Sequence, residues 1–275
     1  MYYKKDLLSA YKCDDLIRVG REKDGGYVIP KRILKSSNIL FSGGIYTDWS
    51  FELDFIKFSR INKFFLVDKD TSIKSQFNHL KSFLKNKKVR SINKFKQLIH
   101  FFYNVPRIYA FRRFCKSKFI EAYLTSSNLK SSQENRMTTL GALIKRLNFK
   151  IKDNSIFLKL DIEGSEWVMI PDILEISKYL SGIAMEVHDL DINGDYLNEF
   201  IIKSNKLGLN LIHVHPNNAG GYCEGTNLPR LLELTFIKSE LLTEDELTAK
   251  KKKPFCYLKE LDRPCDPNQP EMFLE

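Results

Sequence analysis

The sequence predicts an α/β fold in which a mainly parallel β-sheet carries helices on both faces. Seven short apolar runs are spaced along the chain, and each has the length of a strand buried on both sides. Segments that could form helices separate several of these runs, and polar or glycine-rich clusters follow most of them. Because strands and helices alternate, right-handed crossovers would place the strands in one sheet.

The predicted strands are residues 38–44, 64–70, 118–125, 156–163, 182–189, 209–217 and 231–238. Predicted helices lie between them at residues 49–60, 138–149 and 194–208. Either Thr138 or Thr139 is the expected N-cap of the second helix, because a hydroxyl oxygen accepts a hydrogen bond from the first turn. Gly208 is expected to end the third helix.

The segment at residues 90–117 does not fit this alternation, since it mixes aromatic side chains with basic ones. We expect a helix pair, broken near Pro106, that packs its aromatic side chains on the body and turns its lysines outward. The alternative is a basic aromatic face for a membrane surface, a protein partner or a polyanionic substrate. Residues 1–249 are expected to form a single domain with this elaboration, and residues 250–275 an irregular tail.

The positive charge of the chain is concentrated in one segment. The chain has a net charge of +10, but residues 57–136 hold 19 lysines and arginines against four acids, a net +15, so the remainder is net −5. Such a segment could attract phosphates, nucleic acid or an anionic membrane face, and a solvated surface without a partner is the alternative.

Composition excludes several classes of protein. The 275 residues suit one large domain, and a hydrophobic content of 43% suffices for a core. No apolar run approaches the roughly 18–20 residues that span a bilayer, and the first residues lack a signal-peptide core. The five cysteines are odd in number and form no Cys-x-x-Cys pair. Neither a disulfide framework nor a zinc cluster is expected, and the cytoplasm is the expected location.

Glycines and acids follow the predicted strands where a ligand would bind, beyond the carboxyl ends of an open α/β sheet. Gly43 and Gly44 end the first strand, and glycine permits a turn with close contact there. Asp68 and Asp70 follow the second strand, at the place where α/β nucleotide folds bind ribose hydroxyls. Asp161 ends the fourth strand, so these strand ends together predict a site.

The stretch "LKLDIEGSEW" at residues 158–167 carries three acids in six positions. Asp161 is the main candidate for chemistry, and Glu163 is a candidate for the rim of the site. Glu166 is expected to begin the next helix, because a helix N-terminus favours acids.

Two predicted strands carry histidines at alternating positions. Glu186 and His188 share one direction, as do His213 and His215 on the next strand. Histidine is the usual general base near neutral pH, so His188 is the first candidate for that role and His215 the second. His213 is expected to be a buried residue whose hydrogen bonds are satisfied.

The stretches "MTTLGALIKRL" and "IFLKLDIEGSEWVMI" resemble the FkbM family of S-adenosylmethionine-dependent methyltransferases. The segments "RVGREKDGGYVIP", "FSGGIYTDWSFELDF" and "FFLVDKD" look like the branch of this family that has an Asp-Gly-Gly-Tyr motif. The resemblance covers roughly residues 16–240, and "DIEGSE" is its specific part. It implies a Rossmann-like class I methyltransferase fold, whose seven-stranded sheet has its last strand antiparallel. The chain departs from the pattern in having two glycines where many methyltransferases have three.

The resemblance also implies roles for single residues. Gly43, Gly44 and Asp48 would lie near the methionine part of S-adenosylmethionine, and Asp68 would hold its ribose hydroxyls. Asp161 would lie where the methionine part and the acceptor meet.

Other side chains would gather around the acceptor. They are Tyr27, Glu163, Glu186, Asp189, Asn217 and Asn218. Asp161, Glu186 and His188 are also suitable ligands for Mg or Mn, which forms an additional hypothesis.

The expected function is transfer of a methyl group to a hydroxyl of a sugar or nucleotide-activated sugar, in capsule or surface-polysaccharide biosynthesis. The basic segment would then hold a phosphoryl group. Methylation of RNA or protein is disfavoured, because no Asn/Asp-Pro-Pro-aromatic motif is present. A non-catalytic basic module that docks on nucleic acid or a membrane is the alternative from another class. Contact with a membrane surface and assembly into a homo-oligomer are further alternatives for the partners of this chain.

Overall fold

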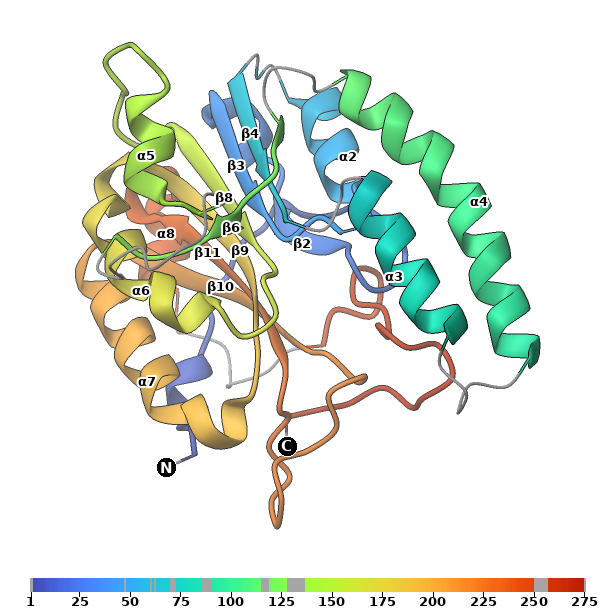
Figure 1. The fold of residues 1–275 in the computed structure, drawn as a ribbon. Coiled ribbons are helices and arrows are strands. Elements are labelled where there is room, and N and C mark those ends of the chain that lie inside the picture. The colour runs from blue at the N-terminus through green and yellow to red at the C-terminus, as the bar shows by residue number, and fades with distance from the viewer. Residues whose placement is uncertain are drawn as a thin grey trace.

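A seven-stranded sheet forms the centre of the molecule, and helices cover both of its faces (Figure 1). The structure is a computed structural model that describes residues 2–46, 48–59, 61, 63–69, 73–85, 91–114, 119–127, 137–249 and 257–274. The strands are β3 (Ile39–Gly43), β4 (Lys63–Val67), β5 (Phe119–Ile120), β8 (Ile156–Leu160), β9 (Leu180–Val187), β10 (Leu209–Pro216) and β11 (Leu232–Lys238). Each predicted apolar run supplies one of them.

The third predicted run is shared between two sheets. Its first part is β5, whereas its second part, β6 (Tyr123–Leu124), pairs with β7 (Met137–Thr138) in a separate two-stranded sheet. The run therefore contributes only a short edge to the main sheet.

The order across the main sheet is β10-β11-β9-β8-β3-β4-β5. Neighbouring strands are parallel except where β11, the last strand in the chain, pairs antiparallel with β9 and β10. The predicted mainly parallel sheet with an antiparallel last strand is confirmed. The chain builds outward from β3 to β5 and then returns to β8 on the other side of β3. Ligands of open α/β sheets bind at such a switch point.

The central strands are buried on both faces because a hydrophobic cluster lies on each side. On β8, Ile156, Leu158 and Leu160 belong to one cluster and Phe157 to the other, as the two-residue period of a strand requires. Lys159 is the exception in this strand, since it is charged and yet only 3% exposed.

The predicted helices are present. The first, α2 (Ser50–Phe58), and the second, α5 (Leu140–Lys145), lie within their predicted ranges. Thr139 caps α5, because its hydroxyl accepts a hydrogen bond of 3.1 Å from the Ala142 amide.

The third predicted helix, α7 (Leu190–Lys206), starts earlier than expected, directly after β9 and Asp189. Gly208 follows its last turn with φ +73°, the left-handed backbone that favours glycine after a helix. The remaining helices are α1 (Ile33–Ser36), α3 (Ile73–Lys85), α4 (Ser91–Phe114), α6 (Glu166–Glu175) and α8 (Glu244–Thr248), with short 3₁₀ turns at Lys5–Leu8, Ser177–Tyr179 and Ser239–Leu241.

A hairpin of β1 (Leu16–Val19) and β2 (Tyr27–Pro30) lies over one face of the sheet. Its connection contains the Asp-Gly-Gly stretch of the Asp-Gly-Gly-Tyr motif, in which Gly25 has φ +87°. The Thr235 hydroxyl on β11 donates a hydrogen bond of 2.7 Å to the Val28 carbonyl oxygen, which fixes the hairpin to the sheet.

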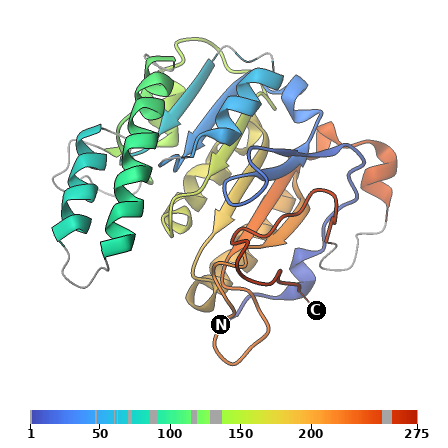
Figure 2. The same cartoon turned by 90° about the vertical axis from the view of Figure 1, so that its right-hand side faces the viewer.

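The predicted break near Pro106 is wrong, because α4 runs through this residue as one helix. Proline removes a single N–H donor, and its fixed φ is compatible with a helix, so tertiary contacts can hold both halves in line. The C-terminal half packs on the body through Phe111, whose ring stacks on Trp49 at 5.1 Å between centroids. The helix pair is instead α3 with α4, which lie side by side at one edge of the molecule (Figures 1 and 2).

The expectation that the aromatic side chains of α4 pack on the body is also wrong for several of them. Phe102, Tyr103, Tyr109 and Phe114 are each more than half exposed. Residue 90 and residues 115–117 of this segment lie outside the described residues.

The C-terminal segment at residues 257–274 contains no helix or strand and lies along the sheet beside the hairpin (Figure 2). Arg263 Nε lies 2.7 Å from Glu22 Oε2 of that hairpin. Residues 250–256 and 275, like Asp70, Cys115 and Cys256, lie outside the part of the chain that the structure describes. Within that part, no helix is both long enough and apolar enough to cross a membrane.

Candidate functional site

Polar side chains from four strands form a row at one edge of the sheet. Glu233 on β11 is the register partner of both Glu186 on β9 and His215 on β10. Asp161 follows Leu160, whose register partner on β9 immediately precedes Glu186. The row continues to Gly43 at the end of β3, where the Asp161 amide donates a hydrogen bond of 3.1 Å to the Gly43 carbonyl oxygen. The sheet therefore brings these predicted site residues to one edge, at its switch point.

The turn after β3 requires glycine at position 44. Gly44 has φ +74°, and a Cβ built there would lie 1.5 Å from the carbonyl oxygen of Asp161. Its amide donates to the Val67 carbonyl oxygen at 3.1 Å, so the turn is fixed to β4 as well. The close approach of β3 and β8 thus depends on the missing side chain.

Asp161 is held by two side chains that reach it from different elements. The Tyr27 hydroxyl on β2 donates a hydrogen bond of 3.1 Å to Asp161 Oδ2, and Lys159 Nζ lies 3.6 Å from the same oxygen. Burial alone would lower the pKa of Lys159, but the charges of Asp161 and Glu52 outweigh it, so the pKa is raised. Lys159 also donates a hydrogen bond of 2.6 Å to the Gly44 carbonyl oxygen, which links the carboxylate to the glycine turn.

His188 lies among three carboxylates. Its Nδ1 is 2.9 Å from Glu166, and its Nε2 is 3.2 Å from Glu186 and 3.6 Å from Glu163. Burial would lower the pKa of His188, but the hydrogen bonds to Glu166 and Glu186 outweigh burial and raise it to about 11. In this arrangement the ring is an imidazolium at neutral pH and has no free nitrogen to accept a proton, so the geometry does not support the predicted role of general base.

Glu166 begins α6, as predicted, and it also positions His188. One carboxylate oxygen accepts a hydrogen bond of 2.9 Å from the Gly164 amide, while the other accepts one of 2.6 Å from the His188 amide. Glu166 is completely buried. By contrast, the Glu163 side chain is 87% exposed and lies at the rim.

The ligand atoms of Asp161, Glu186 and His188 all lie within 4.8 Å of one another. Burial raises the pKa of Glu186 to about 8, and the neighbouring charge of Asp161 adds to this effect. Two carboxylates and one imidazole suit a hard or borderline divalent ion. Glu166 on the other ring nitrogen of His188 is the kind of carboxylate that orients a metal-binding histidine. The predicted residues therefore fit Mg²⁺ or Mn²⁺.

His215, the second candidate for general base, is completely buried. Its Nδ1 lies 3.0 Å from Glu233, and its Nε2 lies 3.3 Å from Glu271 of the C-terminal segment. Burial would lower the pKa of His215, but the hydrogen bond to Glu233 and the nearby carboxylate of Glu271 outweigh burial and raise it to about 10. The expected catalytic role is therefore not supported by this geometry. His213 pairs with Asp262 at 2.9 Å and is buried, as expected.

The two asparagines after β10 have different partners. Asn217 lies in the site, since its side-chain amide donates a hydrogen bond of 3.0 Å to Glu186 Oε2. Asn218 does not, because its side chain binds the backbone of Asp266, Gln269 and Pro270. These contacts do not support the prediction that Asn218 binds substrate, because its side chain anchors the C-terminal segment.

Asp189 starts α7 with a left-handed backbone, φ +51°. Its half-exposed carboxylate lies 3.1 Å from Arg230 Nη2. Asp189, which was expected to bind the acceptor, therefore lies in a surface ion pair with Arg230.

The acids predicted to hold the cofactor are bound to the loop after β3. Asp68 Oδ2 accepts hydrogen bonds of 2.7 Å from the amides of Ile45 and Tyr46. Asp48 pairs with Arg21 of the hairpin connection and accepts a hydrogen bond of 3.1 Å from the Ser50 amide. Both acids therefore lie beside the glycine turn and shape the loop that follows it.

The sequence reasoning missed Lys159 and Glu233. Each is a charged residue inside a run that is otherwise apolar, "IFLKL" and "LELTFIK". A charge in a strand that is buried on both faces must have a buried partner, and this signal could have identified both residues.

No protein-family model matches this sequence, and comparison with the curated proteins gives no match.

Proposed function

We propose that this chain is an S-adenosylmethionine-dependent O-methyltransferase that acts on a hydroxyl of a sugar or nucleotide-activated sugar. The observation that carries the proposal is the contact of the Gly44 turn with Asp161 at the switch point of the sheet. This is the position where open α/β sheets bind nucleotide-like ligands. The resemblance of "DIEGSE" to the FkbM family motif supports the choice of cofactor.

The charge of the site suits a cationic cofactor. Burial raises the pKa of Asp24 in the hairpin connection, and the nearby carboxylates of Asp161 and Glu233 raise it further. Carboxylates in excess favour a ligand with positive charge. S-adenosylmethionine carries a sulfonium and an ammonium group, and it would supply an electrophilic methyl group.

The residues beside the glycine turn would bind this cofactor. Gly43, Gly44 and Asp48 would hold its methionine part, because glycine allows the backbone to approach closely. Asp68 is placed at the end of the neighbouring strand β4, where a ribose would lie.

Asp161, Glu186 and His188 would hold Mg²⁺ or Mn²⁺, whose charge would lower the pKa of an acceptor hydroxyl. Tyr27 and Lys159 position Asp161, Asn217 positions Glu186, and Glu166 positions His188. Because the His188 ring would be bound to the ion, a carboxylate oxygen of Asp161 or Glu186 would accept the hydroxyl proton. The residues thus align the acceptor and remove its proton, which is the main task in methyl transfer to oxygen.

Binding of S-adenosylmethionine by titration calorimetry tests the cofactor. Mass spectrometry of nucleotide-activated sugars incubated with enzyme and cofactor tests the acceptor. Asp161→Asn should abolish methyl transfer, whereas Asp153→Asn, which changes an exposed acid before the start of β8 and so at the opposite end of that strand from Asp161, should not. Normal activity of Asp161→Asn would contradict the assigned site, and absence of cofactor binding would contradict the function.

The exposed aromatic side chains of α4, together with exposed Arg107, favour a second candidate, a module that docks on nucleic acid or membrane. Salt-sensitive binding of RNA without binding of S-adenosylmethionine would support this second candidate.

A further inference from the structure

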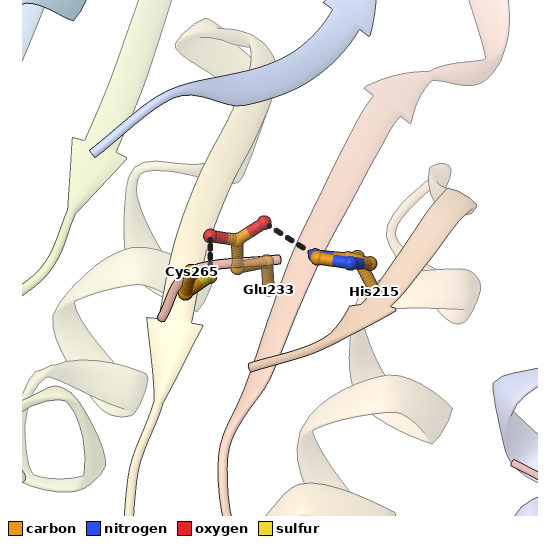
Figure 3. A group of neighbouring side chains, drawn as sticks. All are labelled: His215, Glu233 and Cys265. Carbon is orange, nitrogen blue, oxygen red and sulfur yellow. Dashed lines mark hydrogen bonds and ion pairs between the residues drawn. The ribbon is translucent and has the colours of Figure 1, made fainter. Parts of the chain in front are cut away.

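A second group of three side chains, separate from Asp161, Glu186 and His188, contains nitrogen, oxygen and sulfur atoms that can bind a metal ion. His215 comes from β10, Glu233 from β11 and Cys265 from the C-terminal segment. A ring nitrogen, a carboxylate oxygen and the sulfur lie within 4.8 Å of one another. Figure 3 shows the Glu233 carboxylate between the imidazole and the thiol. The exposed fractions of His215, Glu233 and Cys265 are 0%, 3% and 5%, so all three polar side chains are buried.

Within this group, the His215 ring and the Cys265 thiol contact different oxygens of the Glu233 carboxylate. Glu233 Oε2 lies 3.0 Å from His215 Nδ1, and Glu233 Oε1 accepts a hydrogen bond of 3.4 Å from the Cys265 thiol. The register partner of Glu233 on β9 is Glu186, a further carboxylate. Burying a carboxylate next to another one is costly unless a positive charge lies between or beside them.

Two buried polar atoms beside the group have no hydrogen-bond partner. They are Nε2 of His215 and Oε2 of Glu271. The ring nitrogen lies 3.3 Å from the other oxygen of Glu271, close enough for an ion pair but without hydrogen-bond geometry. A metal ion on Nδ1 would place the only ring proton on Nε2, with Glu271 as its acceptor. A carboxylate commonly orients a metal-binding histidine in this way.

We propose that His215, Glu233 and Cys265 bind a zinc ion, which fastens the C-terminal segment to the sheet beside the candidate active site. This proposal is independent of methyl transfer. A thiolate together with imidazole and carboxylate suits Zn²⁺, whereas Mg²⁺ and Ca²⁺ prefer oxygen ligands alone. Metal-ligand bonds of about 2.0–2.3 Å place tetrahedral ligands about 3.5 Å apart, so the three side chains would fill three of the four positions and a water molecule would fill the fourth.

The binding step releases two protons to solvent. The Cys265 thiol loses its proton to become a thiolate, and the His215 imidazolium loses the proton on Nδ1. Zinc affinity is therefore expected to fall as the pH is lowered. Burial raises the pKa of the Cys265 thiol, and the nearby charge of Glu233 adds to this, so the thiol is protonated without metal.

Another cysteine of the chain provides a matched contrast. Cys13 lies with Asp15 and Glu246 in a group of similar size. There Arg32 already supplies the positive charge, at 2.9 Å from Asp15 and 2.7 Å from Glu246. This group has no need of a metal ion, so Cys13→Ser is the control for Cys265→Ser.

The test is the zinc content of the full chain after loading with Zn²⁺ and removal of free metal. We expect Cys265→Ser to hold one zinc per chain fewer than wild type and Cys13→Ser, because Asp161, Glu186 and His188 can hold a zinc ion in all three. Loading with Co²⁺ should give a thiolate-to-cobalt charge-transfer absorption that only Cys265→Ser abolishes. An equal zinc content of Cys265→Ser and wild type, or a cobalt absorption lost in Cys13→Ser, would overturn the assignment.

A measurement on the wild-type chain covers the case in which Cys265→Ser does not fold. Alkylation with iodoacetamide, followed by peptide mass spectrometry, reports the reactivity of each cysteine separately. Zinc should protect Cys265 and raise the melting temperature, while EDTA should reverse both effects. Equal alkylation of Cys265 with zinc and with EDTA would overturn the proposal, as would a wild-type chain that holds no zinc.

Discussion

The glycine turn at the switch point can be tested by adding a single methyl group. In Gly44→Ala the new Cβ would lie 1.5 Å from the Asp161 carbonyl oxygen, whereas an ordinary contact begins at 3.4 Å, so β3 and β8 would have to separate locally by about 1.9 Å. Two effects then destabilise the variant, the left-handed backbone and the loss of hydrogen bonds around the turn.

The size of the effect follows from these contacts. A non-glycine residue with positive φ costs roughly 1–2 kcal/mol. Separation of the strands would break the hydrogen bonds from Asp161 N to Gly43 O and from Lys159 Nζ to Gly44 O, each worth about 0.5–1.5 kcal/mol. We therefore expect Gly44→Ala to lower the free energy of unfolding by about 2–5 kcal/mol.

Gly221→Ala is the matched control, because Gly221 has φ +67° but no atom within 4 Å of its built Cβ. This variant should show only the backbone cost of roughly 1–2 kcal/mol. Urea unfolding followed by circular dichroism measures both variants under the same conditions. Equal destabilisation of the two would refute the inference that β3 and β8 need glycine for their close approach.

Three further predictions concern the ends of the chain and the metal hypothesis. Glu246→Gln should destabilise the fold at pH 7 and have little effect near pH 2, as measured by urea unfolding at both pH values. Burial would raise the pKa of Glu246, but the Arg32 hydrogen bond and two backbone amides lower it to about 2. The stabilisation from Glu246 is therefore present above about pH 4.5 and is lost as the pH falls through about 2. An unchanged difference at low pH would contradict this. Asn218→Ala should release the segment at residues 257–274 and lower the free energy of unfolding by about 2–4 kcal/mol, because one amide and three carbonyl groups lose their partner. Limited proteolysis should then cut near Asp266, and protection equal to wild type would contradict this prediction. EDTA should abolish methyl transfer and Mg²⁺ or Mn²⁺ alone should restore it; full activity in EDTA would end the hypothesis of a metal on Asp161, Glu186 and His188.

The segments of the fold could be predicted from local sequence because their signals are local. A run such as "IFLKL" has too many apolar side chains for a surface strand, so burial on both faces follows from composition alone. Thr139 and Gly208 mark helix ends through their own backbone and side-chain chemistry. Pro106 shows the limit of such signals, because the contact between Phe111 and Trp49 depends on residues far apart in the sequence.

The roles of the site residues depended on partners that the sequence does not place. Alternation along β10 showed that His213 and His215 point the same way, but not which acids they meet. Asp262 and Glu271 reach them from the C-terminal segment, which has no periodicity. The geometry does not support the roles expected for His215 and Asn218, because the C-terminal segment covers His215 and binds Asn218.

The sequence by itself determined that the chain forms a mainly parallel α/β sheet and that its acids, glycines and histidines follow the strands at one edge. Periodicity and strand-end chemistry are local properties, so they can be read without a structure. Only the tertiary structure decided that β11 lies between β9 and β10 and so brings Glu233 beside both Glu186 and His215. The neighbours of a buried charge are set by strand order and register, and these decide whether a histidine is a base, a metal ligand or a fixed cation.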